Sequence, residues 1–156
     1  MTKLIKIFAP LILLSFFSSC GYTPIFSKKD ANFSIESVKF LGNKDVKGKI
    51  NQALSSYKNK SGKANQISLV ITSSKNIISV SKNSKGEAQT NRVDVDVNVK
   101  IILAENNIIE KNFSKSSIYD VIDRKSEQKL IENKLIENLS GEIAQQIILE
   151  MLKNTK

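Results

Sequence analysis

The chain has 156 residues, with 24 Lys and Arg against 15 Asp and Glu, and a formal net charge of +9 at pH 7. It contains no His, no Trp and a single Cys. The composition therefore removes the commonest general base and the usual nitrogen and sulfur ligands of metal sites. We expect a protein that is not an enzyme and needs no cofactor or metal.

The first 19 residues have the three parts of a secretion signal. Lys3 and Lys6 make a basic start, residues 7–17 are mostly apolar, and two serines follow. The apolar run is shorter than the ~20 residues that cross a membrane comfortably. We therefore predict a cleaved signal peptide over residues 1–19.

The only cysteine lies at the expected cleavage point. Phe17-Ser18-Ser19-Cys20 resembles a bacterial lipobox, in which the cysteine receives a diacylglyceryl group and becomes the mature N-terminus. The usual first residue of the box is Leu. The alternative is a buried cysteine in an uncleaved helix, but a lone thiol invites mispairing in an oxidising compartment. We predict a Cys20 that carries fatty acyl chains such as palmitate, followed by a tether to residue 32. Gly21, in place of Asp, favours sorting to the outer membrane.

Residues 33–60 predict a strand and a helix. Apolar residues alternate over 33–41 with one irregularity near Glu36-Ser37, which indicates a first strand. Over 45–60 the apolar residues recur on one face of a helix, with Asn43 or Asp45 as its N-cap.

Two strands follow that differ in regularity. Over residues 67–80 the apolar positions change from odd to even, which would turn them to the wrong face unless an extra residue intervened. We therefore predict a bulge within 73–77. After a turn at 83–86, six apolar residues alternate with mostly polar ones over 92–103. Such a pattern is typical of an antiparallel strand with one face in water.

The chain ends in a hairpin and a long helix. Asn106-Asn107 predicts a turn, and a fourth strand begins near Ile109 and fades over 117–119. Residues 123–153 carry two adjacent apolar stripes, a face broad enough to cover a sheet. The whole of residues 33–156 then forms one two-layer α+β domain. We expect a four-stranded mixed sheet with both helices on one face, in the order β-α-β-β-β-α.

The positive charge is concentrated in the first part of the mature chain. Residues 20–92 contain 13 basic and 4 acidic residues, whereas residues 93–156 contain 9 and 11. A basic half could meet phosphate-rich lipid or an anionic membrane surface. The excess of Lys over Arg equally fits the compositional bias of an AT-rich genome. Nucleic acid is not an expected partner of an exported lipoprotein.

Two groups of side chains could carry chemistry. Asp94 and Asp96 share one strand face, where Arg92 would neutralise them, so we interpret them as a solvated or interface surface. Lys82, Lys85 and Arg92 surround one turn and could hold a phosphorylated ligand, although their spacing alone favours a lysine-decorated hairpin tip.

Four features in order resemble the LptE family of Gram-negative outer-membrane lipoproteins. The first is Cys20-Gly21 with its aromatic residue and short tether, and the second is the segment GEAQTNR that ends at Arg92. The third is the regular strand over 93–103 with its returning strand, and the fourth is the helical segment IAQQII over 143–148. Together they span essentially the whole mature chain.

The resemblance implies a lipoprotein that plugs a β-barrel lipopolysaccharide translocon, helps it to assemble and assists lipopolysaccharide insertion. It implies an outer-membrane location, on the periplasmic side and within the barrel lumen. The family is credited with binding lipopolysaccharide through basic residues, which correspond here to Lys85, Arg92 and, less closely, Lys129. Two alternatives share the anchor. One is an accessory lipoprotein of another outer-membrane assembly or lipid-transport complex. The other is a lipidated hydrolase, which is disfavoured because the chain has no His and its single Cys is the predicted acylation site.

Overall fold

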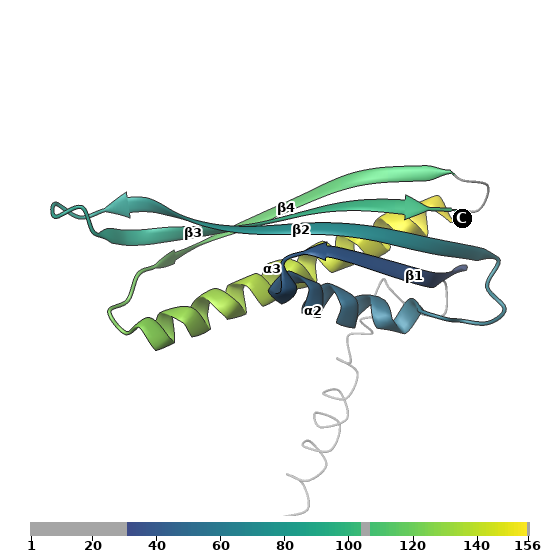
Figure 1. Cartoon of the computed structure of the whole chain (residues 1–156), viewed down its shortest axis with the longest axis horizontal. Coiled ribbons are helices and arrows are strands. Elements are labelled where there is room, and N and C mark those ends of the chain that lie inside the picture. Colours follow the sequence, from purple (N-terminus) through teal and green to yellow (C-terminus); the bar gives the residue numbers. More distant parts are fainter. Residues whose placement is uncertain (1–30, 104–106, 156) are drawn as a thin grey trace, which may run out of the picture. The chain divides into compact units, whose positions relative to one another are not determined.

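The computed structural model describes residues 31–103 and 107–155 (Figure 1). The chain divides into two compact units, residues 1–30 and 31–156, and the description below concerns the second. The predicted signal peptide, Cys20 and most of the predicted tether lie outside the described residues.

The second unit is a two-layer α+β structure, as the sequence predicts. Its sheet has the strand order β1-β2-β3-β4, with β1 parallel to β2 and the other neighbours antiparallel. Both helices lie on the same face of the sheet (Figure 1). In chain order the elements are β1 (Phe33–Gly42), α2 (Lys44–Leu54), the 3-10 turn η2 (Ser55–Tyr57), β2 (Asn65–Lys82), β3 (Ala88–Ile102), β4 (Ile108–Asp120) and α3 (Lys125–Asn154).

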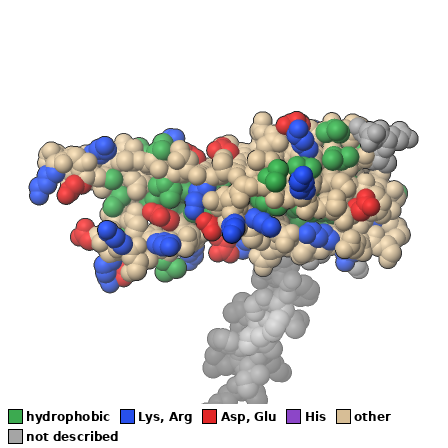
Figure 2. Space-filling model, in the orientation of Figure 1, with side chains coloured by type: hydrophobic (Ala, Val, Ile, Leu, Met, Phe, Trp, Pro, Cys, Tyr) green, Lys and Arg blue, Asp and Glu red, His purple; other side chains and the backbone are tan. Residues whose placement is uncertain are grey.

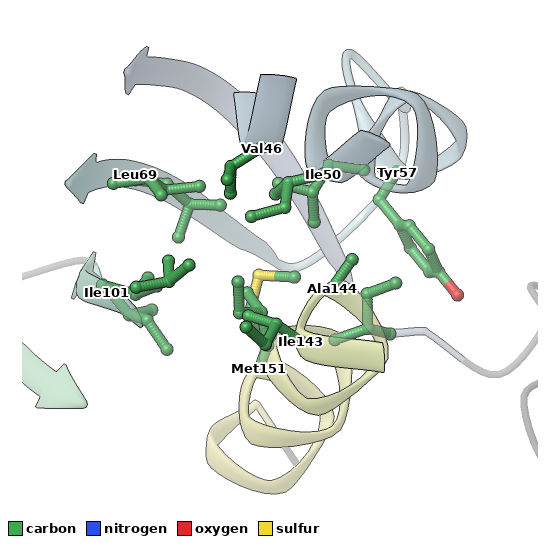
Figure 3. Close-up of a cluster of buried hydrophobic side chains, with 14 of the residues drawn as sticks. Val46, Ile50, Tyr57, Leu69, Ile101, Ile143, Ala144 and Met151 are labelled. Atoms are coloured by element: carbon green, nitrogen blue, oxygen red, sulfur yellow. The ribbon is translucent and has the colours of Figure 1, made fainter. Parts of the chain in front are cut away.

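The core lies between the sheet and the two helices. Alternate residues of β3 from Val93 to Ile101 are buried, as the period of two requires. They meet Val46 and Ile50 of α2 and a continuous stripe of α3 that includes Ile143 and Met151 (Figure 3). Because these side chains face one another across the layers, the apolar patterns of strands and helices stabilise each other.

The irregularity predicted in the first strand and the predicted cap of the first helix are both confirmed. The β1–β2 register shifts between Ile35 and Ser37, which is the irregularity expected near Glu36. Asn43 is the N-cap, and its side-chain oxygen accepts the Asp45 N–H at 2.9 Å.

The predicted end of the first helix, near residue 60, is wrong. The α-helix ends at Leu54, and η2 then carries Tyr57 back onto Phe33, with ring centroids 5.4 Å apart. Lys58 forms an isolated bridge with Ile35. The chain must turn back at this point because β2 begins beside the start of β1.

The bulge predicted within residues 73–77 is also wrong, because β2 and β3 stay in register from Ser68 to Ser79. Polar residues replace apolar ones at positions 73 and 75 of β2, because these core-facing positions meet the N-terminus of α2. Ser73 Oγ accepts the Asn43 N–H at 3.1 Å, and Lys75 lies 2.8 Å from Asp45. The observed register shifts lie farther along, between Ser79 and Lys82.

The two hairpins close as expected at their strand ends. The predicted turn over 83–86 is confirmed by the 3.0 Å bond from Gly86 N–H to Asn83 O. The turn predicted at Asn106-Asn107 lies partly outside the described residues, although Leu103 N–H donates to Asn107 O at 2.9 Å. The fourth strand does not fade, because it pairs with β3 in unbroken register as far as Asp120.

Candidate functional site

The sheet has an open face, which we define as the face opposite α2 and α3. Its middle is a polar band, built from three consecutive rows of cross-strand neighbours in β2, β3 and β4. All nine side chains of this band are short and polar. They are Thr72, Ser74, Asn76, Asp94, Asp96, Asn98, Asn112, Ser114 and Ser116.

Hydrogen bonds between strands order the polar band. Ser114 Oγ donates to Asp96 Oδ1 at 2.6 Å. Asn98 Nδ2 donates to Asn112 Oδ1 at 2.7 Å and to Glu110 Oε1 at 2.9 Å. None of the described helices covers this face, so water or a partner satisfies the remaining polar atoms.

Arg92 lies on the open face, where it is held by Asp94. Its Nη2 donates to Asp94 Oδ2 at 3.2 Å, and its Nε lies 2.9 Å from Oδ1 without hydrogen-bond geometry. The Arg92 side chain is 41% exposed and its neighbours across the strands are Ile78 and Ile118. A phosphate that approached Arg92 would therefore compete with an existing carboxylate partner.

Lys85 lies at the exposed tip of the β2–β3 hairpin. The backbone there is shaped by Asn83, whose side-chain oxygen accepts the N–H groups of Lys85 at 2.9 Å and Glu87 at 3.0 Å. The Lys85 ammonium makes no hydrogen bond or ion pair among the described residues. Lys85 is therefore available to a ligand, at a solvated position.

A cleft of about 1320 Å³ separates the hairpin from the first turns of α3. Figure 2 shows this hollow at the left, between the two projecting parts, with hydrophobic side chains at its back. Lys129 and Lys125 line it from the helix, and Glu87 and Gln89 from the hairpin. Because carboxylates and lysines are mixed along its walls, the cleft is not a uniformly basic surface.

A hydrogen-bond network joins β4 and α3 beside the cleft. Tyr119 Oη donates to Glu132 Oε1 at 2.7 Å, and Gln128 Nε2 donates to the same oxygen at 3.1 Å. Gln128 Oε1 accepts the Ile122 N–H at 2.9 Å. Burial first, and then the bond to Glu132, raise the pKa of the Tyr119 phenol above its ordinary value of 10.0.

The three predicted lipopolysaccharide-binding residues do not form one constellation. Arg92 is on the open face, Lys129 lines the cleft under the opposite face, and Lys85 is at the hairpin tip. Cys20 lies outside the described residues. Sequence reasoning missed the cleft and the Tyr119 network; the signal for the network was a Tyr at a strand end followed by Gln and Glu one helical turn apart.

Two further properties concern the described residues alone. Over residues 31–103 and 107–155, no three carboxylate or thiol side chains gather closely enough to hold a metal ion. No helix in this part of the chain has the length and hydrophobicity of a membrane span.

Two solved structures of bacterial lipoproteins are similar to this one. Rare lipoprotein B from Shewanella oneidensis superposes with a TM-score of 0.57 at 13% identity, covering 76% of this chain and 96% of its own. An uncharacterized lipoprotein B from Nitrosomonas europaea gives 0.53 at 14% identity, covering 80% and 85%. The chain has the fold of these lipoproteins. No protein-family model and no curated protein sequence matches it.

Proposed function

We propose that this chain is an outer-membrane lipoprotein that plugs a β-barrel lipopolysaccharide translocon, helps it to assemble and assists lipopolysaccharide insertion. The observation that carries the proposal is the open face with its polar band. The polar band, with nine short polar side chains in the middle of the open face, suits contact with the hydrophilic interior of a large barrel. The LptE-like order of features in the sequence and the lipoprotein fold support the same reading.

The anchor is the second part of the proposal. Cys20 follows a secretion signal and carries the acyl chains, and more than one chain is needed because a single chain holds a protein only marginally. Mass spectrometry of the mature N-terminus should find acylated Cys20 and no leader. An unmodified Cys20 within an intact leader would refute the anchor.

The barrel contact is tested by site-specific photo-crosslinking in cells. A photo-crosslinking residue replaces Lys100, an exposed position on the open face of β3, or Lys134, an exposed position on α3. The proposal expects a barrel-sized outer-membrane protein to be captured from position 100 and not from position 134. Isolation from detergent-solubilised outer membrane should give the same barrel in equal amount.

Other results would replace the proposal. Capture of the barrel from position 134 alone would place the contact on the helical layer, and the polar band would lose its role. Co-isolation of a different assembly or lipid-transport complex, without the lipopolysaccharide translocon, would favour the accessory-lipoprotein alternative.

A further inference from the structure

The two edges of the sheet differ. At the β1 edge, the segment after η2 occupies the backbone: Asn59 N–H donates to Ile35 O at 3.1 Å. Lys60 N–H donates to Ser34 Oγ at 2.7 Å, and Lys58 bridges Ile35. The register shift at Glu36 adds an irregularity to the same edge. Bulges and covering loops are the devices that prevent an edge from pairing with another strand.

The β4 edge has no such cover among the described residues. Its thirteen residues, Ile108–Asp120, pair with β3 in unbroken register, without proline. Their backbone groups make no hydrogen bond on the side away from β3. Figure 1 shows β4 at the border of the sheet over most of its length. Such a long regular edge is a template for an added strand.

Charges on β4 do not close this edge. Lys111 and Lys115 turn towards α3, where their Nζ atoms lie 3.4 Å from Glu150 and 3.1 Å from Glu142. Glu110, on the open face, lies 3.6 Å from Lys100. Each of these three charged side chains of β4 therefore has an ion-pair partner within its own chain, on β3 or on α3. An added strand would not leave an unpaired charge in a low dielectric.

The helix beside this edge carries exposed apolar side chains. Ile131, Leu135 and Leu149 share a stripe of α3 with Glu142, the residue that reaches β4. Ile131 is 37% and Leu149 is 45% exposed. The free edge and an incompletely buried helix flank thus lie side by side.

We propose that β4 pairs antiparallel with the β4 strand of a second copy of this chain, about a two-fold axis at Ser114. The register centred on Ser114 is the one that pairs all thirteen residues of Ile108–Asp120. It places no like charges opposite each other. Its pairs are Ile108–Asp120, Ile109–Tyr119, Glu110–Ile118, Lys111–Ser117, Asn112–Ser116 and Phe113–Lys115, with Ser114 opposite itself.

The neighbouring registers are disfavoured by charge. A two-fold axis at Phe113 would set Lys111 opposite Lys115, and an axis at Lys115 would set Glu110 opposite Asp120. Like charges directly opposite each other destabilise an antiparallel pair. The pairing centred on Ser114 would join two sheets into one and bring the apolar flanks of the two α3 helices towards each other. Such an isologous interface closes as a dimer.

A single engineered thiol tests the axis. Cys20→Ala in the full chain removes the only natural cysteine, and Ser114→Cys then places one thiol on the axis. Cross-strand Cβ atoms lie about 4.5–5.5 Å apart, close enough for a disulfide after small adjustment. The matched control is Ser116→Cys, because Ser116 is another exposed serine on the same strand face. Its two copies would lie about 13 Å apart, four residues along the pair.

Mild oxidation in detergent should convert most of the Ser114→Cys chain, and little of the Ser116→Cys chain, to a covalent dimer. Adding Ile118→Glu to the Ser114→Cys chain places a carboxylate opposite Glu110 at both symmetry-related ends of the strand pair. This variant should give a dimer yield several-fold lower than the same chain with Ile118→Gln. No dimer from Ser114→Cys, equal yields from both cysteine positions, or a disulfide to another protein would each overturn the proposal. The proposal does not rest on the proposed function, because it concerns the free chain and not a copy that occupies a barrel lumen.

Discussion

Tyr119 Oη donates a 2.7 Å hydrogen bond to Glu132 Oε1, and this contact joins the end of β4 to the second turn of α3. Tyr119 is buried, and its acceptor is a carboxylate. A hydrogen bond to a charged group contributes about 1.5–3 kcal/mol to stability. Tyr119→Phe should therefore lower the free energy of unfolding by about that amount in urea titrations. Glu132→Gln, which keeps an acceptor, should cost less; the reverse order would contradict this role for the bond.

The same tyrosine gives the stability a dependence on alkaline pH. Burial and the Glu132 bond raise the pKa of Tyr119 in the folded chain above its unfolded value. Its contribution is complete below the unfolded pKa and is lost as the pH rises through the folded pKa. Thermal midpoints between pH 9 and pH 11 should fall more steeply for the natural chain than for Tyr119→Phe. Parallel curves would show that the phenol does not couple to folding.

The two faces of β2 give the sharpest test of the layer assignment. Ile71 is fully buried, and its neighbour Thr72 is exposed in the polar band. Ile71→Asp should unfold the domain because it buries an unpaired carboxylate. Thr72→Asp should cost less than about 1 kcal/mol, since it changes only an exposed strand position. Circular dichroism during heating separates the two outcomes, and similar losses would mean that the faces are assigned wrongly.

Alanine substitutions at Gly42 and Gly62 distinguish the cost of backbone strain alone from the cost of strain with a steric clash. Both have positive φ, at 98° and 74°. A Cβ on Gly62 would meet no atom within 4 Å, so Gly62→Ala should cost only the left-handed penalty of about 1–2 kcal/mol. A Cβ on Gly42 would lie 2.0 Å from the Ser73 carbonyl oxygen, so Gly42→Ala should cost at least ~3 kcal/mol. Equal costs by denaturant titration would show that this close approach is absent.

The lowered pKa of Glu150 should make the fold less stable in acid. Burial would raise its pKa, but the Asn154 hydrogen bond at 3.2 Å and the nearby Lys111 charge together lower the pKa below 4.5. A lowered pKa stabilises the fold above the unfolded pKa, and this contribution is lost as the pH falls through the folded pKa. Between pH 5 and pH 3, Glu150→Gln should flatten the decline of the thermal midpoint. Lys111→Met should flatten it in part, and an unchanged slope in both variants would exclude this pair as a cause.

The separation of Arg92 and Lys129 makes a prediction about lipopolysaccharide. One phosphate group cannot contact both residues, because they lie on opposite sides of the sheet. One of the variants Arg92→Ala and Lys129→Ala should weaken binding roughly 3- to 10-fold, a modest loss because both sites are partly solvated. The double variant should have the same affinity for lipopolysaccharide as the single variant that lost more affinity. Multiplied losses in titrations with purified lipopolysaccharide, with Lys134→Ala as control, would show that the ligand reaches both sides.

The sequence by itself determined the order and type of the four strands and the two helices. The alternation over 93–101 and the helical stripes over 135–152 are strong periodic signals, because each residue buries the face that its own secondary structure dictates. Strand β1 lies parallel to β2, an arrangement that the connecting helix allows. The secretion signal and Cys20 are likewise local features of the sequence.

Only the tertiary structure decided where polar residues replace apolar ones inside these patterns. Ser73 and Lys75 break the alternation of β2 because the N-terminus of α2 needs a hydrogen bond and an ion pair there. The first helix ends early because Tyr57 packs on Phe33, a contact between residues distant in sequence. The cleft and the free β4 edge arise in the same way, from elements that meet across the fold. Local periodicity reports which face is buried, and only the packed chain shows which element buries it.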